Sequence, residues 1–375
     1  MTRWIALALT FTLACRAAHE DAPQPAAPAS ALPTAPATEA VLPDAAPPAP
    51  TTLMADAEVG PLIERLSEKG GNFPSENYVT NEASLLHVAA ALRQPKLRDR
   101  AYVGVGPEQN YTYLALLEPR VAYIVDIRRG NLLEHVMFRG CFEVGKTRAA
   151  FLSALLARHE PAQAAPDPLL RAEGIARTRA LFDRLAIPKA PGDDKAITQI
   201  HEAFAKYGLA ISYTMLNSDR KYPTLGDNFA ARDPEGKPAS FMGSEETYAR
   251  VRRMVLENRV IPVVGDFGGK HALRAVAEDM TSRGLSLGVF YASNVEQYLF
   301  EQRSYGTFVE SVRAMPRDDE SLMVRVWFDA GKPHPAQQAG LRTTQLSIPA
   351  NVFVARATKK PFLYYWDVVN QPADQ

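Results

Sequence analysis

Two glycines that directly follow a strongly apolar run constrain the fold of this chain more than any other feature. Residues 101–106 read Ala-Tyr-Val-Gly-Val-Gly, and a short helix is predicted to follow. A second apolar run, 121–125, ends in Asp126, about 20 residues after Gly106. A strand, a glycine turn, a helix and a second strand ending in an acid form the first half of a dinucleotide-type fold. The sequence therefore predicts a Rossmann-like α/β protein with a mainly parallel sheet and helices on both faces.

The glycine turn also indicates a ligand site. Gly104 and Gly106 allow the backbone to turn sharply and to approach a ligand that a β-carbon would keep away. Asp126 stands about where folds of this kind bind a ribose hydroxyl. Two arginines follow Asp126. Arg128 and Arg129 either hold an anionic group, pair with Asp126, or lie exposed at the start of a helix.

Two later apolar runs, 259–264 and 285–291, are each followed by polar or glycine residues and then by a predicted helix. In a parallel sheet, ligands bind beyond the carboxyl ends of the strands, near the point where the strand order reverses. The polar residues that follow the four predicted strands are Asn110, Asp126, Asp266 and Asn294. We expect these side chains to converge on one crevice, although Asn and Asp also favour turns regardless of function.

Residues 1–15 have the features of an export signal. Arg3 supplies a positive charge, and the apolar run after it is too short to span a bilayer as a helix. The run ends in Thr-Leu-Ala-Cys, which resembles the lipobox of bacterial lipoproteins, where the cysteine is acylated and becomes the first mature residue. This resemblance implies lipidation at Cys15, although Thr12 stands where leucine is usual. The alternative is an ordinary signal peptide that is cut nearby, with Cys15 incidental.

Residues 16–55 consist largely of alanine and proline. Such a segment cannot bury enough apolar surface to offset its ordering entropy, and proline favours extended conformations. We interpret it as a disordered tether that holds the following domain off a membrane. Arg16 takes the place of the aspartate that, by resemblance, favours retention at the inner membrane. The expected location is therefore the cell envelope, with a lipid anchor in the outer membrane and the domain facing the periplasm.

The remaining residues, 56–375, are predicted to form one α/β domain. Lys plus Arg and Asp plus Glu each number 42, so no net field attracts nucleic acid and no such partner is expected. If Cys15 is acylated, Cys141 is the only thiol left and no intrachain disulfide can form. His135 has no second histidine or acid at metal-ligand spacing, so we predict a packing role and no metal site.

Other segments are interpreted by their periodicity. Three helices are predicted over 146–159, 169–185 and 195–207, between proline-rich turns. Residues of about 145–245 are therefore interpreted as a helical insertion with a long loop.

Five further segments are predicted from less regular patterns. A helix is predicted over 83–93 and a strand over 209–213. Near the C-terminus, segments 351–355 and 362–366 are predicted to pair with an alternating run at 321–329.

Four stretches carry a resemblance to a known family: residues 104–113, 124–129, 265–269 and 291–300. They resemble an uncharacterised bacterial family, a domain of unknown function that includes predicted lipoproteins. The resemblance covers most of the chain from about Pro61 onward. The core of that family is similar to class I S-adenosylmethionine-dependent methyltransferases. It implies a fold and no reaction, because fold alone does not imply function.

Local chemistry separates S-adenosylmethionine from NAD as the expected ligand. A dinucleotide fingerprint has a third glycine or alanine three residues after the second, where this chain has Gln109. Glu108 would also lie at a helix N-terminus, where it would repel a pyrophosphate. S-adenosylmethionine has no phosphate and carries an ammonium and a sulfonium, so it tolerates an acid there. The expected cofactor-binding residues are Gly104, Gly106, Glu108, Asn110, Asp126, Asp266 and Asn294.

The sequence leaves three functions open: a methyltransferase-like protein that binds S-adenosylmethionine, an NAD(P) enzyme, and a non-catalytic tethered module that keeps the fold. Export argues against catalysis, because a highly polar cofactor does not cross a bilayer unaided. We find no Ser–His–Asp elbow, zinc motif or P-loop that would supply another chemistry. The sequence assigns neither catalytic residues nor a substrate.

The lipid anchor generates a direct test. Cys15→Ala should release the protein from the membrane fraction, because it removes the thiol that is acylated. The measurement is immunoblotting of fractionated cells, together with N-terminal sequencing of the mature protein. Unchanged fractionation, or a mature N-terminus other than Cys15, would show that the anchor is absent.

Overall fold

The computed structural model describes residues 54–73, 75, 77–160, 165–214 and 220–370. The predicted export signal, Cys15 and the predicted tether up to residue 53 lie outside the described residues. Within those ranges, no helix is long and apolar enough to cross a membrane.

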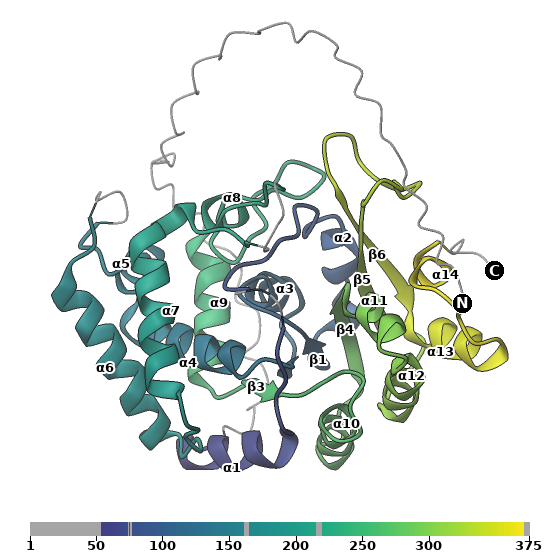
Figure 1. The fold of residues 1–375 in the computed structure, drawn as a ribbon, viewed down its shortest axis with the longest axis horizontal. Coiled ribbons are helices and arrows are strands. Elements are labelled where there is room, and N and C mark those ends of the chain that lie inside the picture. The colour runs from purple at the N-terminus through teal and green to yellow at the C-terminus, as the bar shows by residue number, and fades with distance from the viewer. Residues whose placement is uncertain (1–53, 74, 76, 161–164, 215–219, 371–375) are drawn as a thin grey trace, which may run out of the picture. The chain divides into compact units, whose positions relative to one another are not determined.

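Six strands form one sheet in the order β3-β2-β1-β4-β5-β6 (Figure 1). Strands β1 to β4 are mainly apolar and buried on both faces, as expected where helices cover a parallel sheet. β6 runs antiparallel to β5, and the other neighbours in the sheet are parallel. This arrangement confirms the predicted Rossmann-like, mainly parallel sheet. The strands are β1 (Ala101–Gly104), β2 (Val121–Asp126), β3 (Val260–Val264), β4 (Leu287–Ser293), β5 (Leu322–Phe328) and β6 (Thr343–Pro349).

The position of β3 at the edge explains a proline within it. Pro262 has no backbone N–H, and a central strand would lose a ladder hydrogen bond at that residue. β3 pairs only with β2 in the described sheet, so Pro262 is tolerated there.

One row of helices consists of α3 (Gln109–Leu117), α4 (Arg129–Val144) and α9 (Glu245–Leu256). These three helices pack on one another, and α4 contacts β2 and β3. All the residues of α3 are buried, because α9 covers α3 on its outer side. The first helix after β1 is therefore held firmly against the sheet.

A second row consists of α10 (Ala272–Ser282), α12 (Tyr305–Ala314) and α13 (Ala350–Lys359). α10 contacts β2, and α13 contacts β5 and β6. α1 (Asp56–Leu66) joins this row through α10 and also contacts β3. The crossover helices between β1 and β3 thus cover one face of the sheet and those that follow β3 cover the other, as right-handed crossovers require.

The helical insertion expected at about 145–245 lies between α4 and α9. It contains α5 (Arg148–Leu156), α6 (Pro168–Arg184), α7 (Asp193–Tyr207) and the short α8 (Leu225–Phe229). In Figure 1, α5, α6 and α7 stand together as a teal group beside the sheet. α6 and α7 pack on α4, so the insertion rests on a helix of the first row.

Four predicted elements are wrong. The strand expected at 209–213 is a 3₁₀ turn, Gly208–Ala210, followed by a single bridge from Ser212 to Thr224. The helix expected over 83–93 is mostly turns, and only α2 (Ala89–Leu92) is helical.

The predicted C-terminal partner strands are also wrong. Segment 351–355 lies in α13, and segment 362–366 runs into α14 (Tyr365–Val369). The partner of β5 is β6. Ala350, Phe353 and Val354 have helical spacing and are buried on one side of α13. A five-residue segment with Val and Phe is too short to distinguish the spacing of a helix from the alternation of a strand.

A buried ion pair joins the sheet to the helix that follows β4. Arg325 on β5 is 2% exposed, and its Nε lies 2.6 Å from Oε2 of Glu296 on α11 (Val295–Glu301). Tyr305 donates a hydrogen bond to Glu296, and the guanidinium lies over the Phe353 ring. Loss of either partner would leave an uncompensated buried charge, at a cost of about 3–5 kcal/mol. This pair therefore fixes α11 and the loop before it.

Candidate functional site

A cavity of about 340 Å³ lies at the carboxyl ends of β1 to β4. The strand order reverses between β1 and β4, and open α/β sheets bind their ligands at such a point. The loops after these four strands line the cavity, together with the segment 72–82 and Tyr213 from the insertion. Small-molecule sites have volumes of about 300–1,000 Å³, so the cavity is large enough to be one.

Four of the seven expected binding residues line this cavity: Gly106, Asp126, Asp266 and Asn294. They come from the loops after β1, β2, β3 and β4, respectively. Gly104, Glu108 and Asn110 do not line it. The expected crevice is therefore present, and the three remaining residues stand behind its wall.

Asn110 and Gly104 shape the loop after β1. Asn110 Nδ2 donates to the carbonyls of Val105, Gly106 and Pro107, at 2.8–3.0 Å, and its Oδ1 accepts from Tyr102. A β-carbon on Gly104 would stand 2.2 Å from Oδ1 of Asn110. Gly104 is thus required by the Asn110 side chain, which corrects the expected approach of Gly104 to a ligand.

Position 106 does require glycine, because a φ of +82° is strained for residues with a side chain. Its carbonyl also contacts His135 Nε2 at 3.1 Å, while His135 Nδ1 lies 2.8 Å from the Tyr111 hydroxyl. A carbonyl only accepts, so Nε2 carries the proton and Nδ1 accepts from Tyr111. Burial lowers the pKa of His135 to about 4. His135 is therefore a neutral residue that positions the glycine loop.

Asp126 is paired with Arg128. Its carboxylate accepts from the Arg128 backbone N–H at 2.8 Å and from Nε and Nη2 at 3.1 Å. Of the alternatives for Arg128, the structure thus selects the pair with Asp126. Arg129 turns away and pairs with Asp193 of the insertion at 2.7 Å. A ribose hydroxyl at Asp126 would share the carboxylate with Arg128.

Asp266 presents one carboxylate oxygen that is occupied and one that is not. Oδ1 accepts from the backbone N–H of Gly268 at 2.8 Å. None of the described residues donates to Oδ2, and none accepts from the backbone N–H of the next residue, Phe267. Asp266 and Phe267 both line the cavity, so they bring an acceptor and a donor to one wall.

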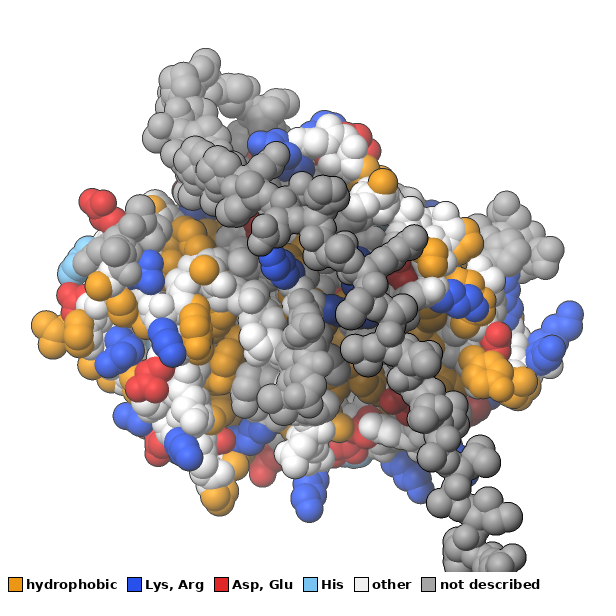
Figure 2. Space-filling model, turned by 45° about the horizontal axis from the view of Figure 1, so that its top comes forward, with side chains coloured by type: hydrophobic (Ala, Val, Ile, Leu, Met, Phe, Trp, Pro, Cys, Tyr) orange, Lys and Arg blue, Asp and Glu red, His pale blue; other side chains and the backbone are white. Residues whose placement is uncertain are grey.

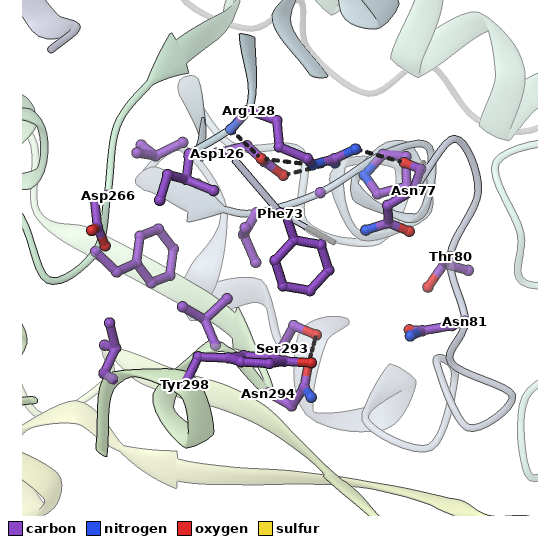
Figure 3. Close-up of a pocket in the computed structure, with 18 of the residues that line it drawn as sticks. Phe73, Asn77, Thr80, Asn81, Asp126, Arg128, Asp266, Ser293, Asn294 and Tyr298 are labelled. Atoms are coloured by element: carbon purple, nitrogen blue, oxygen red, sulfur yellow. Dashed lines mark hydrogen bonds and ion pairs between the residues drawn. The ribbon is translucent and has the colours of Figure 1, made fainter. Parts of the chain in front are cut away.

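Aromatic and amide side chains complete the lining, and sequence reasoning did not identify most of them. Figure 3 shows Asp126, Arg128 and Asn77 on one side, Ser293, Asn294 and Tyr298 on the other, and Phe73 between them. The rings of Phe73 and Tyr298 meet edge to face, with centroids 5.3 Å apart. Flat apolar faces beside amides suit an aromatic, hydrogen-bonding ligand.

Glu82 is a buried carboxyl group in the cavity wall, 1% exposed. It accepts hydrogen bonds from Tyr291 and Ser293 at 2.5 Å and from Gln345 at 2.8 Å. Burial raises its pKa above the ordinary value, against the opposing effect of these hydrogen bonds. Tyr291 and Gln345 come from β4 and β6, and no local spacing in the sequence connects them with Glu82.

Glu108 lies outside the cavity and ties three segments together. It accepts from the Thr80 backbone N–H at 3.1 Å and from Asn228 Nδ2 of the insertion at 3.0 Å. Burial raises its pKa from 4.5 to about 7. Glu108 thus holds the segment 72–82 and α8 to the glycine loop.

Within the described ranges, no group of three or more His, Cys, Asp or Glu side chains is placed to hold a metal ion. Surface charge is mixed. On the face in Figure 2, Lys and Arg side chains are scattered among Asp and Glu.

Fold and site together define a Rossmann-like α/β protein with a ligand-sized cavity at the switch point of its sheet. The chain belongs to the family described as Domain of unknown function (DUF7790), which matches residues 78–352. This match includes all six strands and the whole insertion. No curated protein gives a significant match.

Glu108→Gln should flatten the fall in stability with rising pH. The pKa of Glu108 is about 7 in the folded protein and 4.5 in the unfolded chain, so the protonated group favours the fold. This stabilisation is complete below pH 4.5 and is lost as the pH rises through 7. The difference amounts to about 3 kcal/mol. Glutamine does not titrate and keeps an oxygen for the Thr80 and Asn228 donors. Urea denaturation at pH 5 and pH 8 measures the effect.

Burial also raises the pKa of Glu82 and Glu134, so the unfolding free energy of the variant should still fall in part as the pH rises. Glu257→Gln, which removes a half-buried carboxylate beside Arg259, serves as the control and should leave the slope unchanged. Equal slopes for the wild type and Glu108→Gln would contradict the role of Glu108.

Proposed function

We propose that this protein is an exported, lipid-anchored protein of the cell envelope whose Rossmann-like domain binds S-adenosylmethionine or a related adenosine-type ligand. One observation carries the proposal: the glycine loop after β1 and the acids after β2 and β3 line the same cavity at the switch point. In Rossmann-like folds these are the positions that bind a nucleoside. The antiparallel last strand agrees with the similarity to class I methyltransferases.

Asp266 and Phe267 support recognition of an adenine base. The edge of adenine presents an amino donor next to a ring-nitrogen acceptor. The Asp266 Oδ2 acceptor and the Phe267 N–H donor form the complementary pair on the cavity wall. Phe73 and Tyr298 offer flat surfaces for the base.

NAD is disfavoured on steric and electrostatic grounds. The Gln109 side chain lies beside Gly106, where the third residue of a dinucleotide fingerprint is small. Gln109 also donates to the Val105 carbonyl, which fixes it across the start of α3. A pyrophosphate needs close approach to that helix N-terminus, and the side chain obstructs it.

A non-catalytic binding module tethered to a membrane is the second candidate. Arg128 already satisfies much of the hydrogen-bonding capacity of Asp126, as expected where a cofactor contact has been lost or replaced. Export would also separate the domain from a cytosolic methyl donor. Under this candidate, the protein keeps the fold and the cavity but transfers no methyl group.

Titration calorimetry with S-adenosylmethionine, S-adenosylhomocysteine and NAD tests the proposal. A charge-assisted hydrogen bond contributes about 1.5–3 kcal/mol, so Asp126→Ala should weaken adenosine ligands about ten- to a hundredfold. Gly106→Val should abolish binding, because valine strains the turn and enters the cavity. Arg129→Met, which removes a neighbouring arginine that pairs with Asp193 outside the cavity, is the matched control and should bind as the wild type.

Two results would count against the proposal. Absence of heat from both S-adenosyl ligands at millimolar concentration, with circular dichroism showing folded protein, would favour the tethered module. Tighter binding of NAD than of S-adenosylmethionine would overturn the choice of ligand. Binding without methyl transfer would indicate a sensor or a carrier.

A further inference from the structure

The Glu82 carboxylate is surrounded by side chains from three separate elements. Tyr291 and Ser293 come from β4, Gln345 from β6, and Gln109 and Tyr113 from α3. Gln345 bridges Glu82 Oε2 and the Tyr113 hydroxyl, while Gln109 donates to the Tyr291 hydroxyl at 3.2 Å. We call these six side chains the Glu82 network. Glu82 and Gln109 both line the cavity, so a ligand bound there would contact the network.

Three of these side chains, Tyr291, Ser293 and Gln345, donate hydrogen bonds to Glu82, and none of the three is charged. Tyr291 and Ser293 donate to Oε1, and Gln345 donates to Oε2. Within the part of the chain that the structure describes, no lysine, arginine or histidine forms an ion pair with Glu82. Buried carboxylates are normally paired with a cation. This one is arranged for the ionised form but has no countercharge of its own.

The backbone of β4 is distorted to make one of these contacts. The register with β5 shifts between Tyr291 and Ser293, and Ser293 has a left-handed φ of +52°. A β-bulge re-aims a side chain, and a non-glycine residue with positive φ costs about 1–3 kcal/mol. Here the distortion brings Ser293 Oγ to 2.5 Å from Glu82. Strain of this kind is concentrated at functional sites.

Some oxygen atoms of the Glu82 network accept no hydrogen bond from the described residues. Three donors occupy three of about four acceptor positions on the Glu82 carboxylate. Two amide oxygens, Gln109 Oε1 and Gln345 Oε1, are buried and have no partner among the described residues. Rotating either amide would set its oxygen against Val105 O or the Glu82 carboxylate, so the present orientation is the stable one. An ammonium group would supply several donors and a positive charge.

We propose that Glu82 recognises a cationic group of the ligand, an ammonium or a sulfonium, and so selects adenosine derivatives that carry a positively charged side arm. This inference rests on the proposed function and adds a specificity-determining residue to it. Gln345 from outside the cavity and Ser293 from its wall position the carboxylate. The Gly106 turn and Gln109 border the same part of the cavity.

Protonation of Glu82 should oppose this recognition. The titratable groups near its carboxylate are Tyr102, Tyr113, Tyr291, Tyr365 and Glu108. Burial raises the pKa of all five, so the tyrosines stay neutral in the physiological range and only Glu108 titrates there. A cation beside Glu82 lowers the pKa of its carboxyl group, and binding therefore releases a proton wherever Glu82 was protonated. Affinity for cationic ligands should fall as the pH falls through the raised pKa of Glu82.

Calorimetry with three ligands tests the inference on the complete protein. The cationic groups of S-adenosylmethionine are an ammonium and a sulfonium, and S-adenosylhomocysteine keeps only the ammonium of these two. Both ligands also carry a carboxylate, whereas 5′-methylthioadenosine carries no charge on its side arm. Glu82→Gln should weaken the first two about ten- to a hundredfold and leave 5′-methylthioadenosine within about twofold. Glu257→Gln, far from the cavity, should leave all three unchanged.

A measurement on the wild type covers the case in which Glu82→Gln does not fold. Titrations in two buffers of different ionisation enthalpy count the protons released, and we expect more release with S-adenosylmethionine than with 5′-methylthioadenosine below neutral pH. Equal release, or equal weakening of charged and uncharged ligands by Glu82→Gln, would overturn the role of Glu82 while 5′-methylthioadenosine binding upholds the adenosine site. If the wild type binds none of the three, the proposed function falls and the inference falls with it.

Discussion

The side chain of Asn110 holds the loop on which the cavity depends. Its amide donates to three successive carbonyls of the loop after β1, and its oxygen accepts from Tyr102 in the strand itself. A backbone that turns so sharply leaves carbonyls without ladder partners, and buried carbonyls require donors. Asn110 supplies them, and His135 adds a donor at Gly106. The loop is therefore rigid before any ligand arrives, which lowers the entropic cost of binding.

The sheet could be predicted from the sequence because its signals are local. Strands β1 to β4 are short apolar runs that end at Gly, Asn or Asp, and each one forms where it was expected. Gly106, Asp126, Asp266 and Asn294 follow from the same rule, because carboxyl ends of parallel strands share one edge. The C-terminal segment failed for the opposite reason. Its helices carry short Val and Phe runs whose burial is decided by packing on α12 and β5.

The chemistry of the site depends on contacts that no spacing reveals. Glu82 is separated from Tyr291 and Gln345 by most of the chain, yet both donate to its carboxylate. Phe73 and Tyr298 likewise meet only in the folded protein. Gly104 and Asn110 were expected to bind a ligand, but they contact each other and do not line the cavity. Local sequence therefore located the edge of the sheet, and tertiary structure decided which side chains reach the cavity.

Two features of the cavity point in different directions. The Asp126–Arg128 pair resembles a self-satisfied structural contact, whereas the Glu82 carboxylate has no countercharge among the residues that the structure describes. A ligand that shares Asp126 with Arg128 and brings a cation to Glu82 reconciles them. The account is tested most directly by purifying the protein from its native cell under mild conditions and identifying any bound small molecule by mass spectrometry. It predicts an adenosine derivative with a cationic side arm, whereas a bound ligand without an adenosine group would contradict it.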